Sequence, residues 1–163
     1  RQRGVYVIAG GAGGLGRITA EWLMSAYDAD VVLLGRSARE APPAAGAGTC
    51  RYVRADIDDP VAVRAAIRAV RAEFGRIDGA FHSALVLEDR SIARMDEDCL
   101  RRVLAPKTTG LAHFAAALCE ARVDLLVLYS SAIAQSCAPG QANYAAASTF
   151  EDAYGLALAG RFG

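Results

Sequence analysis

Near its start the chain reads Val5-Tyr-Val-Ile-Ala-Gly-Gly-Ala-Gly-Gly-Leu-Gly16. The apolar run that opens this stretch predicts a buried parallel strand, and a helical pattern follows the glycines. Glycine is needed where a strand turns into a helix with its backbone against a pyrophosphate, because a Cβ atom would collide with the ligand. The free N–H groups and positive dipole end of the helix would then face the phosphates. This context favours a dinucleotide site over a bare glycine turn, and the residues expected to form it are Gly10, Gly11, Ala12, Gly13, Gly14, Leu15 and Gly16.

The composition is that of an ordinary soluble domain. The 163 residues are 53% hydrophobic and 22% charged, with a formal net charge of zero. A zero net charge favours neither nucleic acid nor an anionic membrane as a partner. No apolar run approaches the roughly 20 residues of a spanning helix. Because Arg1-Gln-Arg-Gly4 leads straight into the first strand, no signal peptide is expected.

The four cysteines are Cys50, Cys99, Cys119 and Cys137. They have neither the paired spacing of a zinc site nor the density of a disulfide framework. We interpret them as small apolar fillers in a reducing compartment. The sequence therefore predicts a cytoplasmic location and no metal site.

Apolar runs and helical periodicity alternate along the chain. Strands are expected at residues 5–9, 31–34, 51–55, 77–84 and 123–129. Helices are expected at residues 14–27, 60–74, 96–121 and 141–159. Pro106 should bend the third helix, and the Ala-, Pro- and Gly-rich segment 37–50 should form an irregular loop. Asp58-Asp59-Pro60 is a typical helix start, and Gly75 is a typical helix end.

This alternation predicts an α/β fold with a doubly wound parallel sheet, Rossmann-like, in the strand order 3-2-1-4-5. No internal linker divides the chain, so residues 1–163 are expected to form a single domain. The chain stops after a helix, where such a sheet usually continues. We therefore expect a fragment that lacks the C-terminal strands and the lid.

The end of the second predicted strand indicates which nicotinamide cofactor binds. An acidic residue about 20 positions past the glycines would hold the ribose 2′-hydroxyl of NAD. Arg36 stands there instead, and a guanidinium suits the 2′-phosphate of NADPH. A solvated loop arginine is the alternative. Asp56, at the end of the third strand, could accept a hydrogen bond from the adenine amino group, or it could be an ordinary turn residue.

A set of motifs spread over nearly the whole chain resembles the ketoreductase domain of modular polyketide synthases, within the short-chain dehydrogenase/reductase superfamily. The motifs are Gly10-Gly-Ala-Gly-Gly-Leu-Gly16, Leu34-Gly-Arg-Ser37, Ala55-Asp56, Phe81-His-Ser-Ala84, Leu104-Ala-Pro-Lys107, Ser130-Ser131 and Gly140-Gln-Ala-Asn-Tyr-Ala-Ala-Ala147. The resemblance implies NADPH-dependent reduction of a β-keto thioester carried by the phosphopantetheine of an acyl carrier protein, with other synthase domains as further partners. It also implies cofactor contacts from Ser37, Ile57, Ser83, Ala84, Lys107 and Tyr144.

The resemblance assigns the catalytic roles to three residues. Tyr144 matches the general acid; a phenol has an ordinary pKa near 10, which a nearby ammonium lowers. Lys107, 24 residues before Ser131, matches the ketoreductase lysine, because position 148 lacks the lysine of the wider superfamily. Ser131, 13 residues before Tyr144, would complete a small oxyanion site. The alternatives are a packing tyrosine, a solvated lysine and a serine that caps a turn.

Several positions depart from the family pattern. Ser148 occupies a catalytic position where the family typically has an asparagine, which helps organise the proton relay behind the tyrosine. A serine hydroxyl there can still hydrogen-bond but offers one donor rather than two. Ala9 and Leu85 replace a threonine and a glycine. The run Thr149-Phe-Glu-Asp152 matches a subset of these domains that also lacks the asparagine, so we interpret Ser148 as the mark of a subtype.

A short acidic segment bears on stereochemistry. Leu87-Glu88-Asp89 resembles the Leu-Asp-Asp signature of domains that give the D-configured alcohol. Gln141 replaces the tryptophan typical of the opposite group. An acidic loop without a role is the alternative.

Two other functions remain open. A catalytically silent module, kept for architecture or carrier-protein docking, would have its proton relay broken at Ser148. A free-standing short-chain reductase or epimerase would share the cofactor site.

Overall fold

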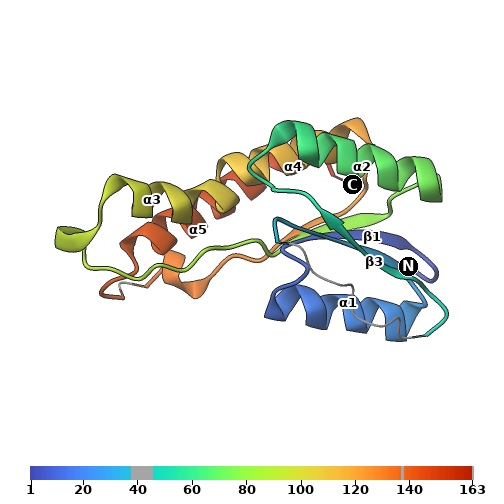
Figure 1. Ribbon diagram of the computed structural model, residues 1–163, viewed down its shortest axis with the longest axis horizontal. Coiled ribbons are helices and arrows are strands. Elements are labelled where there is room, and N and C mark those ends of the chain that lie inside the picture. The colour runs from blue at the N-terminus through green and yellow to red at the C-terminus, as the bar shows by residue number, and fades with distance from the viewer. Residues whose placement is uncertain (38–45, 137, 163) are drawn as a thin grey trace.

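Five parallel strands form one sheet in the computed structural model, which describes residues 1–37, 46–136 and 138–162 (Figure 1). The strands are β1 (Val5–Ala9), β2 (Asp30–Gly35), β3 (Cys50–Arg54), β4 (Gly79–His82) and β5 (Leu126–Leu128). Their order in the sheet is β3-β2-β1-β4-β5, and every neighbouring pair is parallel. The predicted doubly wound sheet and its strand order are confirmed.

Helices cover both faces of this sheet. The helices are α1 (Gly14–Tyr27), α2 (Pro60–Phe74), α3 (Glu97–Leu104), α4 (Thr109–Glu120) and α5 (Ala142–Leu158). Three short 3₁₀ turns are η1 (Ile92–Arg94), η2 (Ala105–Lys107) and η3 (Ala132–Ala134). Figure 1 shows α1 on one face and α2 beside α4 on the other, while α3 and the start of α5 extend past the sheet. The carboxyl ends of the strands point toward this extension.

The ends of α2 illustrate how the sequence determines the elements. The Asp59 carboxylate accepts hydrogen bonds from the N–H groups of Val61 (2.9 Å) and Ala62 (3.1 Å). Such a cap contributes about 1 kcal/mol. Gly75 ends the helix in the left-handed conformation, at φ 76°. The predicted start and end of this helix are both confirmed.

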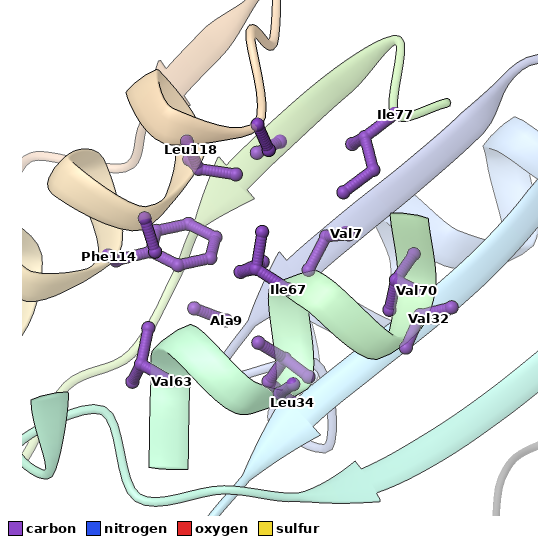
Figure 2. Packing of buried hydrophobic residues seen from close by; sticks show 14 of the residues in the cluster. Val7, Ala9, Val32, Leu34, Val63, Ile67, Val70, Ile77, Phe114 and Leu118 are labelled. Atoms are coloured by element: carbon purple, nitrogen blue, oxygen red, sulfur yellow. The ribbon is translucent and has the colours of Figure 1, made fainter. Parts of the chain in front are cut away.

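The larger core cluster lies between the sheet and the α2–α4 layer (Figure 2). Alternate strand residues such as Val7 and Val32 point into it, and Ile67 and Phe114 meet them from the helices. The intervening strand residues, such as Ile8, pack under α1 instead. Because both faces are covered, the strands are apolar throughout, which is why the sequence shows runs rather than alternation.

Three predicted elements differ in detail. The strand expected over residues 77–84 is shorter, because β4 covers only Gly79–His82. The single bent helix expected over residues 96–121 is two helices, α3 and α4, because Pro106 interrupts the hydrogen-bond ladder within η2. The last strand is three residues long rather than seven, because the chain still closes the end of α4 through the hydrogen bond from the Val123 N–H to the Leu118 carbonyl. The middle of the predicted loop, residues 38–45, and Cys137 lie outside the described residues. No helix in the described part of the chain is long and apolar enough to cross a membrane.

Candidate functional site

A cavity of about 410 Å³ lies where β1, β2, β3 and β4 end. The lining contains most of the predicted cofactor-binding residues: Gly10, Ala12, Gly13, Gly14, Leu15, Gly16, Arg36, Ser37, Asp56, Ile57, Ser83 and Ala84. The edge of an α/β sheet where strands end is the usual ligand site of this fold. The sequence therefore located the cavity and most of its wall.

The glycines of the turn have different tasks. Gly10 has a φ of +75°, and a Cβ atom there would lie 2.5 Å from the Ala84 nitrogen. A Cβ on Gly16 would lie 2.6 Å from the Gly11 Cα. Gly14, in contrast, has nothing within 4 Å of its Cβ position and lines the cavity. Gly10 lets the turn pack against the residues that follow β4, and Gly16 lets the start of α1 pack against the turn itself. Gly14 leaves the backbone open to a ligand.

Gly11 is the predicted glycine that lies elsewhere. Among the described residues it is buried and does not line the cavity. A Cβ atom on Gly11 would lie 2.7 Å from the Leu33 side chain. Its role is close packing of the turn on β2 and not contact with a ligand.

The first turn of α1 fits a phosphate group. Within the described residues no side chain caps this helix at Gly13, and its first turn holds no acidic residue. The N–H groups of the first turn therefore remain without side-chain acceptors, at the positive end of the helix dipole. Together with the open backbone at Gly14, this fits the pyrophosphate of a dinucleotide.

Backbone contacts hold the end of β2 in place beside the cavity. The Tyr52 hydroxyl donates to the Ser37 carbonyl (2.7 Å), and the Arg54 Nε donates to the Arg36 carbonyl (3.1 Å). The Arg36 side chain is exposed. A guanidinium at the rim of the cavity can pair with an added phosphate.

Asp58 is a residue of the wall that the sequence analysis did not single out. Its Oδ1 atom is buried and has no hydrogen-bond partner within the described part of the chain. Burial raises the pKa of the Asp58 carboxyl, and the neighbouring Asp56 raises it further. The signal was the acidic run that we interpreted only as a helix start.

Lys107 lies at the centre of a second group of predicted residues. It is the only lysine in the sequence and is 1% exposed. Its Nζ donates to the Tyr129 carbonyl (2.7 Å) and to the Glu151 carboxylate. The same atom lies 5.8 Å from the centre of the Tyr144 ring. The ammonium therefore sits between the end of β5 and the face of α5, and the alternative of a solvated lysine is wrong.

Ser131 follows Tyr129 by two residues and caps the start of η3. Its Oγ accepts a hydrogen bond from the Ile133 N–H (3.3 Å). This is the turn cap that we gave as the alternative to a catalytic serine. A hydroxyl that accepts in this way can still donate its own hydrogen. Capping therefore fixes the Ser131 side chain without using its donor.

Tyr144, Ser148 and Glu151 share one face of α5, at the spacing i, i+4, i+7. Ser148 is buried, and its Oγ has no partner in the described structure. Glu151 was not among the predicted site residues: its spacing places it on the same helix face as Tyr144, but no local motif marks it. His82, in the quoted motif Phe81–Ala84 but given no role there, bonds Glu151 through Nδ1 (2.8 Å).

The predicted stereochemical residues are brought together. The Gln141 side-chain amide donates to the Asp89 carboxylate (2.9 Å), and the Asn143 amide donates to the Glu88 carbonyl (2.9 Å). Leu87 is 56% exposed. The acidic segment is thus held against the start of α5 by Gln141 and Asn143, which lie three residues and one residue before Tyr144.

Glu88 also joins this segment to α3. The Arg102 guanidinium pairs with its carboxylate through two hydrogen bonds of 2.9 Å. This pairing lowers the pKa of Glu88 from 4.5 to about 2. A depressed folded-state pKa gives stability that is present above the unfolded value and lost as pH falls toward the folded value.

We expect Glu88→Gln to flatten the acid dependence of stability between about pH 4.5 and pH 2, because the variant has no carboxylate to protonate. The measurement is the urea midpoint at several pH values in this window, compared with wild type. Arg102→Gln should flatten it as well. An identical slope in all three proteins would contradict this role of the pair.

Comparison with known proteins agrees with this geometry. A family model described as KR domain matches residues 4–159. Polyketide synthase ThaG of Burkholderia thailandensis is 43% identical over 168 residues, which cover 99% of this chain and 3% of ThaG. Polyketide synthase PksN of Bacillus subtilis is 35% identical over 162 residues, 95% of this chain and 3% of PksN. The chain thus spans a small part of the curated relatives that it matches.

Solved structures of ketoreductases are similar to this chain in fold and sequence. An N-terminal ketoreductase from the macrolactin assembly line has a TM-score of 0.89 and 31% identity, over 97% of this chain and 34% of that one. A ketoreductase domain from the bacillaene assembly line has a TM-score of 0.87 and 30% identity, over 98% of this chain and 42% of that one.

Proposed function

The chain belongs to the KR domain family, and on this premise we propose that it reduces a β-keto acyl thioester, carried on an acyl carrier protein, to the hydroxyacyl thioester. Membership of this family implies oxidoreductase chemistry with a nicotinamide cofactor. We further propose that the cofactor is NADPH and that the chain is part of a multidomain polyketide synthase. In this proposal residues 1–163 are a single nucleotide-binding domain within that synthase, and the much greater length of the relatives supports this view.

NADPH supplies a hydride when it is bound. The turn from Gly10 to Gly16 and the first turn of α1 would hold the pyrophosphate, and Arg36 would hold the 2′-phosphate. Asp56 would accept from the adenine amino group. The cavity volume and the open backbone at Gly14 support these assignments.

Three side chains would act on the keto group. Ser131 and Tyr144 donate hydrogen bonds to the keto oxygen and so stabilise the negative charge that develops there. The keto carbon accepts the hydride, and the oxygen takes the Tyr144 hydroxyl proton, which gives the alcohol. The Lys107 ammonium stabilises the tyrosinate that remains until solvent returns a proton.

The buried Lys107 beside the Tyr144 ring is the observation that carries this proposal. A lysine is almost never buried unless its charge is paired, and burial of the chain's one ammonium against a phenol suits an acid catalyst. Pro106, the neighbour of Lys107, lines the cavity, so the two groups of residues adjoin. By the same resemblance, Leu87–Asp89 and Gln141 favour the D-configured product.

The test is an assay of the synthase module with NADPH and a β-keto thioester surrogate. We expect the near-ultraviolet absorbance of NADPH to fall as the hydroxy thioester appears, with the D-configured alcohol resolved by chiral chromatography. NADPH binding without oxidation would favour a silent docking module, for which the unpartnered Ser148 hydroxyl would be the cause.

Replacement of Arg36 tests the cofactor preference. Arg36→Glu should weaken NADPH by about 10–100-fold, because a charged hydrogen bond contributes roughly 1.5–3 kcal/mol. NADH, which lacks the 2′-phosphate, should change far less. Arg94→Glu makes the same charge change at an exposed residue outside the cavity lining and is the control. Equal weakening of both cofactors by Arg36→Glu would refute the contact.

A further inference from the structure

Three buried ionisable side chains form a chain of hydrogen bonds behind Tyr144. Glu151 bonds Lys107 through Oε2 and His82 through Oε1, and His82 and Glu151 are both 0% exposed. The second ring nitrogen of His82, Nε2, lies 3.0 Å from the Pro106 carbonyl. The group connects β4, η2 and α5 at the point where the proposed acid catalyst sits.

The hydrogen-bond partners determine the charge of this group. A carbonyl oxygen can only accept, so His82 Nε2 carries a hydrogen. The contact between His82 Nδ1 and Glu151 Oε1 needs one more hydrogen, which sits on either atom. In both arrangements the His82–Glu151 pair is neutral overall: imidazolium with carboxylate, or imidazole with carboxylic acid.

This neutrality matters for Lys107. A lone carboxylate beside the ammonium would cancel most of the charge that acts on Tyr144. With His82 satisfying the carboxylate, Glu151 can hold the ammonium in place while the cluster keeps a net charge of +1. The Tyr129 carbonyl supplies the second anchor of the same nitrogen.

We propose that Glu151 is a positioning residue for the reduction: its carboxylate fixes the Lys107 ammonium beside Tyr144. His82 pairs with the same carboxylate and so keeps Glu151 from neutralising the charge of Lys107. The inference rests on the proposed function. Ser148 and Glu151 lie one and two turns beyond the catalytic tyrosine on the same face of α5. Within the described structure the Ser148 hydroxyl forms no hydrogen bond to Lys107, and Glu151 does.

Substitutions of Glu151 test whether it positions the Lys107 ammonium, and a substitution of His82 tests the effect of charge. Glu151→Leu removes the anchor, so kcat should fall by about 10²-fold, the loss that a misplacement of about 1 Å can cause. The KM values should change little, because binding of neither substrate involves Glu151. Glu151→Gln can accept from Lys107 and donate to a neutral His82, so it should recover at least about tenfold of that loss.

His82 provides the charge test. His82→Leu leaves a carboxylate that pairs with Lys107 alone, so kcat should fall. The double variant His82→Leu/Glu151→Gln lacks that carboxylate, so its kcat should be higher than that of His82→Leu alone. This gain is expected even though the double variant has lost a second native side chain. A purely structural role predicts the opposite order, with the double variant the less active.

The outcomes are distinct. No turnover in wild type would overturn the proposed function. Melting temperatures measured in the synthase module would then decide whether Glu151 holds the Lys107 ammonium. Glu151→Leu should melt on the order of 5–10 °C lower, because it leaves a buried ammonium without its partner, and Glu151→Gln should recover more than half of that loss. Equal melting of wild type and Glu151→Leu would overturn the inference there.

In an active protein, three results would overturn it. These are an unchanged kcat in Glu151→Leu, an equal loss in Glu151→Gln, or no gain in the double variant. If Glu151→Leu does not fold, Glu151→Gln and the His82 pair decide alone.

Discussion

Tyr144→Phe should lower kcat by about 10²–10⁴-fold, the usual contribution of a positioned general acid. The substitution removes one oxygen and keeps the ring, so the Lys107–ring contact at 5.8 Å and the packing of α5 should persist. The Kd for NADPH should therefore stay within about twofold. Initial rates with a keto thioester, together with a fluorescence titration of NADPH, measure both quantities.

Tyr154→Phe is the matched control. Tyr154 lies on the same helix and stacks on Phe150, with ring centres 5.5 Å apart. Loss of its hydroxyl should leave kcat at the wild-type value. Turnover that survives in Tyr144→Phe would exclude the phenol as the acid.

Gly10→Ala should destabilise the fold strongly. A left-handed conformation costs a non-glycine residue about 1–2 kcal/mol, and the crowding adds about 1–3 kcal/mol. The new methyl group would meet Ala84 backbone atoms, which cannot rotate away as a side chain would. Since β4 would be pushed from the turn, NADPH affinity should fall as well. Urea unfolding and a binding titration provide the two measurements.

Gly14→Ala is the control for stability. Its methyl group would have nothing within 4 Å, and alanine suits a helix better than glycine by roughly 0.5–1 kcal/mol. The control should therefore unfold at the same or a higher urea concentration. A Gly10→Ala protein as stable as the control would mean that the turn is looser than the structure has it.

The sequence predicts most of the fold because burial on both faces produces an unmistakable pattern. Val31-Val-Leu-Leu34 is a short, β-branched apolar run that favours a strand covered on both faces, and Asp59 and Gly75 mark the ends of α2 by local hydrogen bonds and backbone geometry. The last strand was overestimated, because apolar residues beyond the strand, such as Val123, pack in the core from a turn. Periodicity records burial, and it does not distinguish a strand from a buried turn.

The candidate site was predicted unevenly for a similar reason. Residues next to a glycine turn or at a strand end, such as Arg36 and Asp56, occupy fixed positions relative to local signals. Glu151 and His82 do not, since they are 69 residues apart and meet only through the tertiary contact between their side chains. A charged residue on a buried helix face becomes informative once its partners are known.

The most direct test of the account is the fate of the transferred hydrogen. The synthase module is incubated with NADPH in which both hydrogens of the reactive ring carbon are deuterium and with a keto thioester on its carrier protein, and the product is examined by mass spectrometry. We expect a hydroxyacyl thioester with one deuterium on the new carbinol carbon in wild type, and almost none in Tyr144→Phe. Bound NADPH with no deuterium in the wild-type thioester would contradict it.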